Sequence, residues 1–145
     1  MSAVPERATT ISLEFMAAMR EWENKFARLY RRENGRPETH AHQAKIELEP
    51  IYEKYLTKRD RKYGRMASAS AGWPPEFDPD AGKIVATESI NDRKVILESL
   101  WTHPTAVPVH TEKNRFTMTY KNGEWRLDRK ENYSAYQGRW VKRAL

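Results

Sequence analysis

No cysteine occurs among the 145 residues, so the chain has neither a disulfide framework nor a thiolate metal site. Its stability must come from packing, which suits a reducing compartment. No run of about eighteen apolar residues occurs, and the first ten residues lack the apolar stretch of a signal peptide. These absences predict a cytoplasmic protein that neither crosses a membrane nor leaves the cell by that route.

Motifs of several enzyme classes are missing as well. No serine lies in a Gly-x-Ser-x-Gly elbow, and neither Gly-x-x-x-x-Gly-Lys-Ser/Thr nor Gly-x-Gly-x-x-Gly occurs as a phosphate-binding loop. His40 and His42 are two residues apart, a spacing that places them on different faces of a helix. The sequence therefore predicts no metal site, no cofactor and no catalytic residue.

A general acid–base site leaves no linear motif, so four side chains stay candidates for one: His103, His110, Asp128 and Tyr133. Each is more simply interpreted as a solvent-facing or loop residue, because His103 ends one alternating strand pattern and Asp128 lies on the polar side of another. The residues themselves favour a protein that binds over an enzyme.

The composition suits one folded domain spanning residues 1–145. Apolar residues make up 39% of the chain and aromatic residues 11%, which supplies large core-filling side chains. The net charge of +6 is spread along the chain, apart from a dense run from Lys58 to Lys62 that Asp60 interrupts. We interpret this run as a solvated helix end, so we expect no nucleic-acid partner.

Two amphipathic helices are predicted in the first half. Between Thr10 and Arg32 the large apolar residues recur every three or four positions, and Asn34-Gly35 ends the pattern. They are Phe15, Met19, Trp22, Phe26 and Leu29. A second pattern runs from Pro37 to Tyr63-Gly64 with Pro50 inside it, so we expect a kink or two abutting helices there.

A long loop from residue 65 to 82 follows. Its prolines exclude both a helix and a central strand, and a loop of this length is usually functional or disordered. Trp73 and Phe77 argue against disorder, because aromatic side chains among prolines need something to pack on, either this domain or a partner.

The second half predicts antiparallel strands, which makes the fold class α+β. Lys83–Ile90 and Arg93–Trp101 form one hairpin, with Val95, Leu97 and Trp101 on one face. Arg115–Lys121 and the residues from Trp125 form another around Asn122-Gly123, a type I′ turn sequence. The connection 103–114 is predicted to run over an edge, and the C-terminal extension 132–145 is either a strand or a short helix.

The order of these elements resembles the NTF2-like superfamily, in which a curved sheet forms a cone around N-terminal helices. The hairpin from Phe116 to Asp128 is similar to the last pair of strands in many members. The segment Trp73-Pro-Pro-Glu-Phe-Asp-Pro79, just before the first strand, resembles the NTF2-fold immunity proteins, including the group paired with Rhs-type polymorphic toxins.

This resemblance implies a protein that binds the toxic domain of a cognate effector in the cytosol and neutralises it. A cationic surface would speed association with an acidic partner, and buried aromatic or arginine anchors would supply most of the affinity. We expect the partner-binding anchors to be Trp73, Phe77, Asp78, Arg129 and Trp140. A homodimer also stays open.

Two alternatives remain at this point. The NTF2-like superfamily includes isomerases and hydratases, which would need an apolar pocket holding an acid–base residue with a shifted pKa. The basic stretches could alternatively bind nucleic acid, with an affinity that falls steeply with salt.

Overall fold

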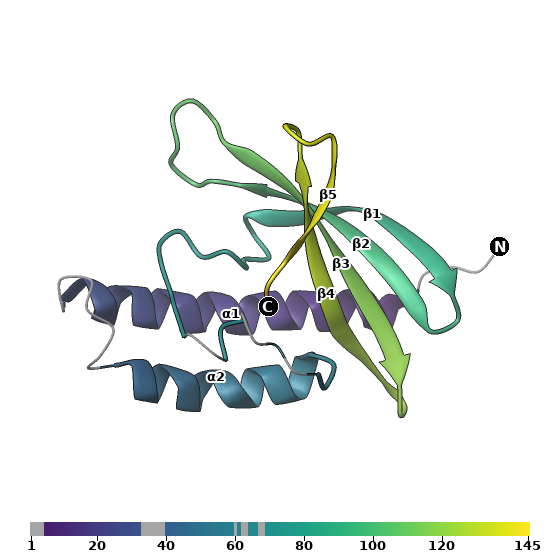
Figure 1. Ribbon diagram of the computed structural model, residues 1–145, viewed down its shortest axis with the longest axis horizontal. Helices are drawn as coiled ribbons and strands as arrows, with labels where there is room; N and C mark the ends of the chain where they lie inside the picture. Colours follow the sequence, from purple (N-terminus) through teal and green to yellow (C-terminus); the bar gives the residue numbers. More distant parts are fainter. Residues whose placement is uncertain (1–4, 33–39, 60, 62–63, 67–68) are drawn as a thin grey trace.

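The computed structural model describes residues 5–32, 40–59, 61, 64–66 and 69–145. Within them lie two helices and five strands: α1 (Glu6–Arg32), α2 (Ala41–Tyr55), β1 (Gly82–Asn91), β2 (Lys94–Thr102), β3 (Thr111–Lys121), β4 (Glu124–Ser134) and β5 (Arg139–Arg143). The helices lie side by side on one face of a curved antiparallel sheet with the strand order β1-β2-β3-β4-β5 (Figure 1). The predicted α+β architecture is confirmed.

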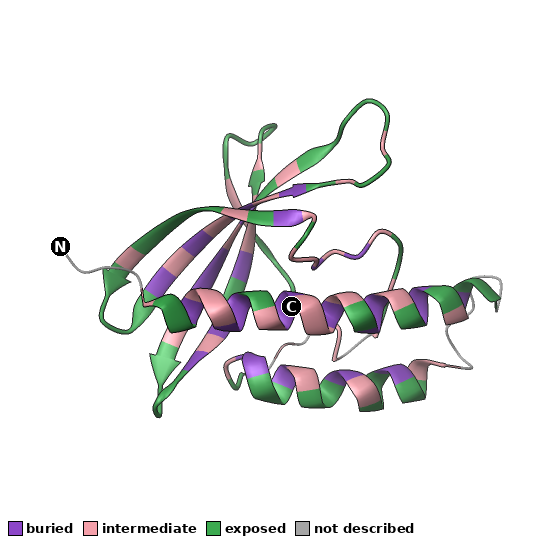
Figure 2. Cartoon of the chain, turned by 180° about the vertical axis from the view of Figure 1, so that it is seen from behind, coloured by how far each residue is buried: buried purple, intermediate pink, exposed green. Residues whose placement is uncertain are grey.

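Helix α1 follows the predicted apolar stripe. Four residues of the stripe are buried, and the fifth, Leu29, is partly buried against the same core. The buried side chains face the sheet and the second helix (Figure 2). The predicted start at Thr10 is wrong by about one turn, because buried Ala8 and Ile11 extend the apolar face back toward Glu6. The predicted stop at Asn34-Gly35 lies outside the described residues.

Helix α2 is a single helix despite Pro50, so of the two structures expected there, a kink or two abutting helices, the second is wrong. Pro50 lies on the exposed side, where water can reach the carbonyl that loses its hydrogen-bond donor. The opposite side buries Ala44, Leu48, Tyr52 and Tyr55. The predicted start at Pro37 lies outside the described residues.

The end of α2 comes at Tyr55, well before the predicted Tyr63-Gly64. Leu56 adopts an extended backbone (φ −102°, ψ 152°) and forms a parallel bridge with Leu127 of β4. The next amide, Thr57 N–H, donates to the Leu127 carbonyl at 2.9 Å. Arg126 Nη1 caps the helix by donating to carbonyls of its last turn, including that of Lys54 at 3.2 Å. The chain therefore leaves the helix because β4 offers it hydrogen bonds.

Both predicted hairpins form. β1 pairs with β2 up to Asn91↔Lys94, and β3 pairs with β4 around Asn122-Gly123, whose φ angles of 53° and 79° fit the predicted type I′ turn. The inner face of the sheet buries Val95, Leu97, Trp101, Phe116, Met118, Trp125 and Leu127. All of these side chains except Trp101 join those of the helices in one hydrophobic cluster.

The strands run further than predicted at one end of the sheet. β3 begins at Thr111 rather than Arg115, because residues 111–114 pair with residues 99–102 of β2. The connecting loop is thereby shortened to residues 103–110. Within the segment 132–145, β4 continues to Ser134, and after a turn β5 returns antiparallel to it. The last segment thus contains a strand, one of the two structures left open above.

A β-bulge at Asp128 reverses the inside–outside alternation of β4. Thr117 pairs with Arg129 and Met118 pairs with Leu127, so Asp128 is an extra residue on β4. Before the bulge Trp125 and Leu127 face the core, and after it Lys130 does, with 4% of its surface exposed. The bulge therefore places a lysine inside the fold.

The sheet forks beyond the pair Asn114↔Asn132. Past this point β3 pairs with β2 alone and β4 pairs with β5 alone. The Asn132 side-chain amide donates to Asn114 Oδ1 at 3.0 Å and to the Lys113 carbonyl at 3.3 Å. These side-chain hydrogen bonds replace the missing backbone ladder where the two hairpin arms separate.

Four charged side chains fasten the 65–82 loop to the rest of the fold: Glu23, Arg65, Glu76 and Lys130. Arg65 Nη2 lies 2.7 Å from Glu23 Oε1 and 2.5 Å from Glu76 Oε2, and Lys130 Nζ donates to Glu76 Oε1 at 2.5 Å. Glu23 also accepts the backbone N–H groups of Glu76 and Phe77, each at 3.1 Å. We refer to these four residues as the charged quartet, and its formal charges cancel.

The charged quartet holds its carboxylates in different electrostatic settings. Burial raises the pKa of Glu23, although Arg65 and the Phe77 N–H oppose that rise. Burial alone would raise the pKa of Glu76 too, but the charges of Lys130 and Arg65 outweigh it and hold the pKa below its ordinary value. Each carboxylate therefore depends on Arg65.

We predict that Glu23→Ala lowers the free energy of unfolding by about 3–5 kcal/mol, because Arg65 loses a buried partner and two backbone N–H groups lose their acceptor. Urea unfolding followed by circular dichroism measures the loss. Glu21→Ala, in the same helix but with 81% of its side chain exposed, is the control and should change it by less than about 0.5 kcal/mol. Equal unfolding midpoints for the two variants would contradict the role of the charged quartet.

Candidate partner-binding site

The five predicted anchors do not form one patch. Trp73 is exposed at 52%, with its ring edge-on to His103 at 5.8 Å. Arg129 and Trp140 lie on β4 and β5, away from the helices, where the outer face of the sheet meets solvent. The 65–82 loop and the outer face of the sheet are therefore separate surfaces.

Phe77 is held inside the molecule, and the partly buried Asp78 is held by hydrogen bonds. Phe77 is 3% exposed and packs edge-on against Phe15 with ring centroids 5.0 Å apart. Asp78 Oδ1 accepts from Arg20 Nη1 at 3.2 Å and from the Asp80 N–H at 2.8 Å. The expectation that these two side chains contact a partner does not fit this arrangement, because the core and Arg20 already occupy them.

Trp140 belongs to an aromatic and cationic cluster on the outer face of the sheet. The Arg115 guanidinium lies 4.5 Å from the Trp140 ring centroid and forms a two-point ion pair with Glu131, at 2.9 and 3.3 Å. Tyr133, 40% exposed, packs edge-on against Trp140 at 5.5 Å. Tryptophan, tyrosine and arginine held in place by neighbours are the side chains that dominate protein–protein hot spots.

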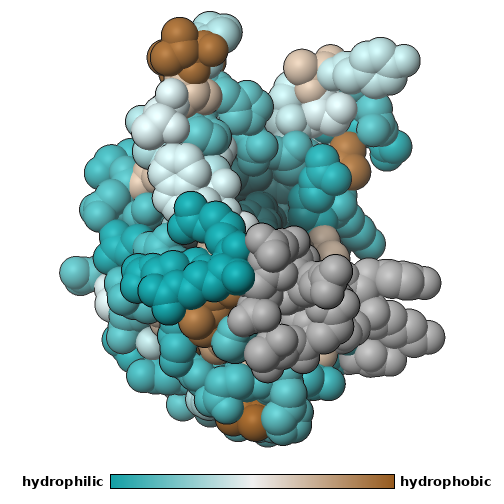
Figure 3. Space-filling view, turned by 90° about the vertical axis from the view of Figure 1, so that its left-hand side faces the viewer, coloured by the Kyte–Doolittle hydropathy of each residue, from teal (hydrophilic) through white to brown (hydrophobic). Residues whose placement is uncertain are grey.

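The two arms beyond the fork carry the most exposed apolar side chains. Val107 and Val109 are 95% and 76% exposed in the loop between β2 and β3, and Tyr136 is fully exposed in the turn between β4 and β5. Both segments extend away from the helices, and a hollow separates the two projections (Figure 3). Apolar tips around a hollow suit contact with another protein.

A basic recess opens along the edge of β4 that faces away from β3. This edge bonds to Leu56 and Thr57 at one end and to β5 at the other, and the recess lies between these two contacts. Its volume is about 460 Å³. The lining residues are Arg59, Arg61, Gly64, Asp128, Arg129, Lys130, Lys142, Arg143, Ala144 and Leu145. Six of them are arginine or lysine, so the recess strongly favours negative charge.

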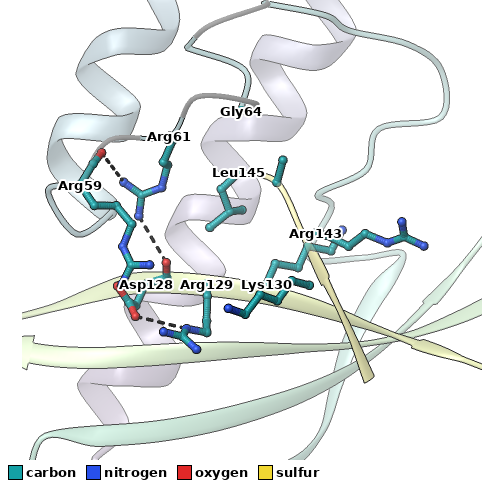
Figure 4. Close-up of a pocket in the computed structure, with 10 residues that line it drawn as sticks. Arg59, Arg61, Gly64, Asp128, Arg129, Lys130, Arg143 and Leu145 are labelled. Carbon is teal, nitrogen blue, oxygen red and sulfur yellow. Dashed lines mark hydrogen bonds and ion pairs between the residues drawn. The ribbon is translucent and has the colours of Figure 1, made fainter. Parts of the chain in front are cut away.

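The C-terminal segment closes one side of this basic recess. It passes close to Gly64, where an added Cβ would lie 1.6 Å from the Leu145 carbonyl oxygen, so a larger residue would displace it. Figure 4 shows Arg59 and Arg61 from the segment after α2 facing Asp128 and Arg129 of β4, with the Arg143 side chain pointing outward. The walls are thus formed by β4, by β5 with the residues after it, and by the segment after α2, which lies far earlier in the sequence.

Asp128, the bulge residue, is the point on which these cations converge. Its Oδ1 accepts from Thr57 Oγ1 at 2.7 Å and from Arg59 Nη2 at 2.5 Å, and Arg129 Nε lies 3.5 Å from Oδ2. Burial alone would raise the pKa of Asp128, but the Thr57 hydrogen bond and the charges of Arg59 and Arg129 lower it below its ordinary value. Asp128 is therefore a carboxylate held by arginines, which makes it a poor general base.

A second recess of about 780 Å³ adjoins the first through Arg59 and Asp128. It adds Lys58, Lys94, Lys121 and Arg126 to the cationic surface, together with the acidic Glu124. The basic run from Lys58 to Lys62, which we interpreted from the sequence as a solvated helix end, comes after the last residue of α2. Arg59 and Arg61 of this run line the first recess. The signal in the sequence that could have indicated this recess was the presence of two basic runs, near 58–62 and 139–143.

The other acid–base candidates do not meet Asp128. His103 Nδ1 accepts from the backbone N–H groups of Thr105 and Ala106, at 3.1 and 3.0 Å, so it shapes the β2–β3 loop. His110 Nε2 lies 3.3 Å from Glu112 Oε1. Among the described residues, no group of three or more His, Asp or Glu is placed to hold a metal ion, and no helix is long and apolar enough to span a membrane.

Comparison with known proteins decides the family. The family model described as NTF2 fold immunity protein matches residues 7–144. This chain belongs to that family. It is also 35% identical over 136 residues to a protein from Dickeya dadantii (strain 3937) named Immunity protein RhsIA, and the match covers 94% of each chain. No solved structure gives a significant match.

The family assignment confirms the resemblance to NTF2-fold immunity proteins and the Rhs group, and the two helices on a curved five-stranded sheet agree with it. It says nothing about which surface of this immunity-family member contacts another protein. The basic recess, the outer-face cluster around Trp140 and the two arms are the candidate surfaces.

We predict that Asp128→Asn makes stability less dependent on pH in acid. Because the pKa of Asp128 is lowered on folding, its stabilising contribution is complete above the ordinary value of 3.8 and disappears as the pH falls below it. Wild-type stability should therefore fall more steeply than that of the variant between about pH 5 and pH 2, as measured by urea unfolding at each pH.

Asp92→Asn is the matched control, because Asp92 is an exposed residue of the turn between β1 and β2. The stability of this variant should fall with pH as steeply as that of the wild type. The same slope in all three proteins would contradict the placement of Asp128 among the arginines.

Proposed function

We propose that this protein binds the toxic domain of a cognate effector and neutralises it in the cytosol without catalysing a reaction. The observation that carries the proposal is the match of the immunity-protein family model to residues 7–144. The name of the Dickeya dadantii relative, Immunity protein RhsIA, supports it. Binding would block the active site of the toxin or the approach of its substrate.

The surface of this chain suits a protein partner. Trp73, Trp140 and Arg129 remain as proposed anchors, because each keeps exposed surface and is held by its neighbours. Large, pre-positioned side chains bind with little loss of conformational entropy, which is why such residues dominate interfaces. The tips of the two arms would add apolar contacts around them.

Coexpression tests the proposal directly. The C-terminal toxin domain encoded next to this gene should stop growth when produced alone, and the present chain should restore it. A catalytically inactive form of that toxin domain should co-purify with the chain. The matched control is an unrelated toxin domain, which this chain should not neutralise. Absence of both rescue and co-purification would rule out the proposed function.

We predict that Trp140→Ala and Trp73→Ala each lower the affinity for the inactive toxin domain by about 10-fold or more, as measured by titration calorimetry. Tyr120→Ala is the control, because Tyr120 is 37% exposed beside the β3–β4 turn, at the opposite end of the sheet from the arms. If all three variants bind like the wild type, the anchors lie elsewhere, although toxin binding itself would stand.

A further inference from the structure

We infer that the basic recess beside the Asp128 bulge binds carboxylate side chains from an acidic segment of the toxin. The inference rests on the proposed function and adds the chemistry of the contact. It concerns the recess formed by the segment after α2, the bulge in β4 and the C-terminal segment.

The cations of the recess exceed the anions available to them. Arg61 donates to uncharged oxygens, namely the carbonyls of Thr57 and Asp128 and the Thr57 hydroxyl, at 2.6, 3.3 and 3.0 Å. Lys142 makes no ion pair within the described part of the chain. Asp128 is the sole acidic side chain among the described lining residues. Among the described lining residues, positive charge therefore exceeds negative charge.

The arginines also keep unused hydrogen-bond donors. A guanidinium has five N–H groups in a planar fork. Arg59 contacts Asp128 through Nη2 alone, and Arg129 contacts the same carboxylate through Nε alone. Each of the two arginine side chains is 44% exposed. Both arginines can donate hydrogen bonds to a second carboxylate without releasing Asp128. Asp128 thus shows, within the chain itself, how this recess holds a carboxylate.

Two cations of the recess are held in place by their neighbours before any ligand arrives. The floor of the recess includes Lys130, which Glu76 holds within the charged quartet, and Arg61 is fixed by the hydrogen bonds given above. Burial lowers the pKa of Arg61, and the nearby charge of Arg59 lowers it further, which reflects repulsion between the two cations. An incoming carboxylate would relieve this repulsion at little cost in ordering side chains.

The lining favours acidic protein over nucleic acid. Proteins that bind single strands combine cations with aromatic platforms on which bases stack. No aromatic side chain is among the described residues that line either recess. The exposed aromatic residues lie elsewhere: Trp73 in the 65–82 loop, Tyr136 at the tip of one arm, and Tyr120 and Tyr133 on β3 and β4.

A double charge reversal tests the inference with the full chain. Arg129→Glu/Lys142→Glu should lower the affinity for the inactive toxin domain about 100-fold, because two lining cations become repulsive to carboxylates. Arg28→Glu/Lys45→Glu is the matched control with the same change in net charge, at exposed positions on α1 and α2. This control variant should lose less than about threefold in affinity for the inactive toxin domain. Equal losses in the two variants would overturn the inference.

A second measurement does not require the toxin. Hexaglutamate titrated into the isotope-labelled chain should shift the amide NMR signals of residues 59–61, 128–130 and 142–144 in the wild type and the control variant, but not in the recess variant. Unshifted signals there, or shifts caused by an oligothymidylate and not by hexaglutamate, would overturn the inference. If the toxin domain does not bind at all, the proposed function fails, while this titration still decides whether the recess takes carboxylates.

Discussion

The ion pairing of Arg65 with Glu23 and Glu76 is the interaction on which the arrangement of this molecule depends. It joins α1, the 65–82 loop and, through Lys130, strand β4, which are three separate elements of the chain. A buried charge without a partner is costly, so removing one member of the charged quartet destabilises the arrangement of the others. These contacts hold the described part of the loop around Glu76 against α1, and Phe77 enters the core beside Phe15.

The bulge at Asp128 links this interior to the surface. One extra residue in β4 sends Lys130 inward to Glu76 and leaves Asp128 at the strand edge with Thr57 and Arg59. The same local irregularity therefore completes the charged quartet and organises the basic recess. Stability and the proposed contact with the toxin consequently share one structural cause.

Local patterns predicted the elements that depend on local physics. The apolar spacing from Phe15 to Phe26 and the Asn122-Gly123 turn needed no distant partner, and both formed as expected. Features set by distant contacts could not be predicted in this way. α2 stops at Tyr55 because of Leu127, and Phe77 packs inward while nearby Trp73 stays exposed. The recess joins basic runs about eighty residues apart, which only the folded chain brings together.

The fork at Asn114 and Asn132 has a consequence for how such proteins diversify. Beyond it the two arms share no backbone ladder, so an insertion or substitution in residues 104–109 need not disturb residues 135–138. His103 and His110 at the base of the first arm pack against buried Trp101. Beyond the fork, the backbone of each arm is therefore independent of the other. Under the proposed function, substitutions in one arm could change which toxin is bound while the other arm keeps its structure.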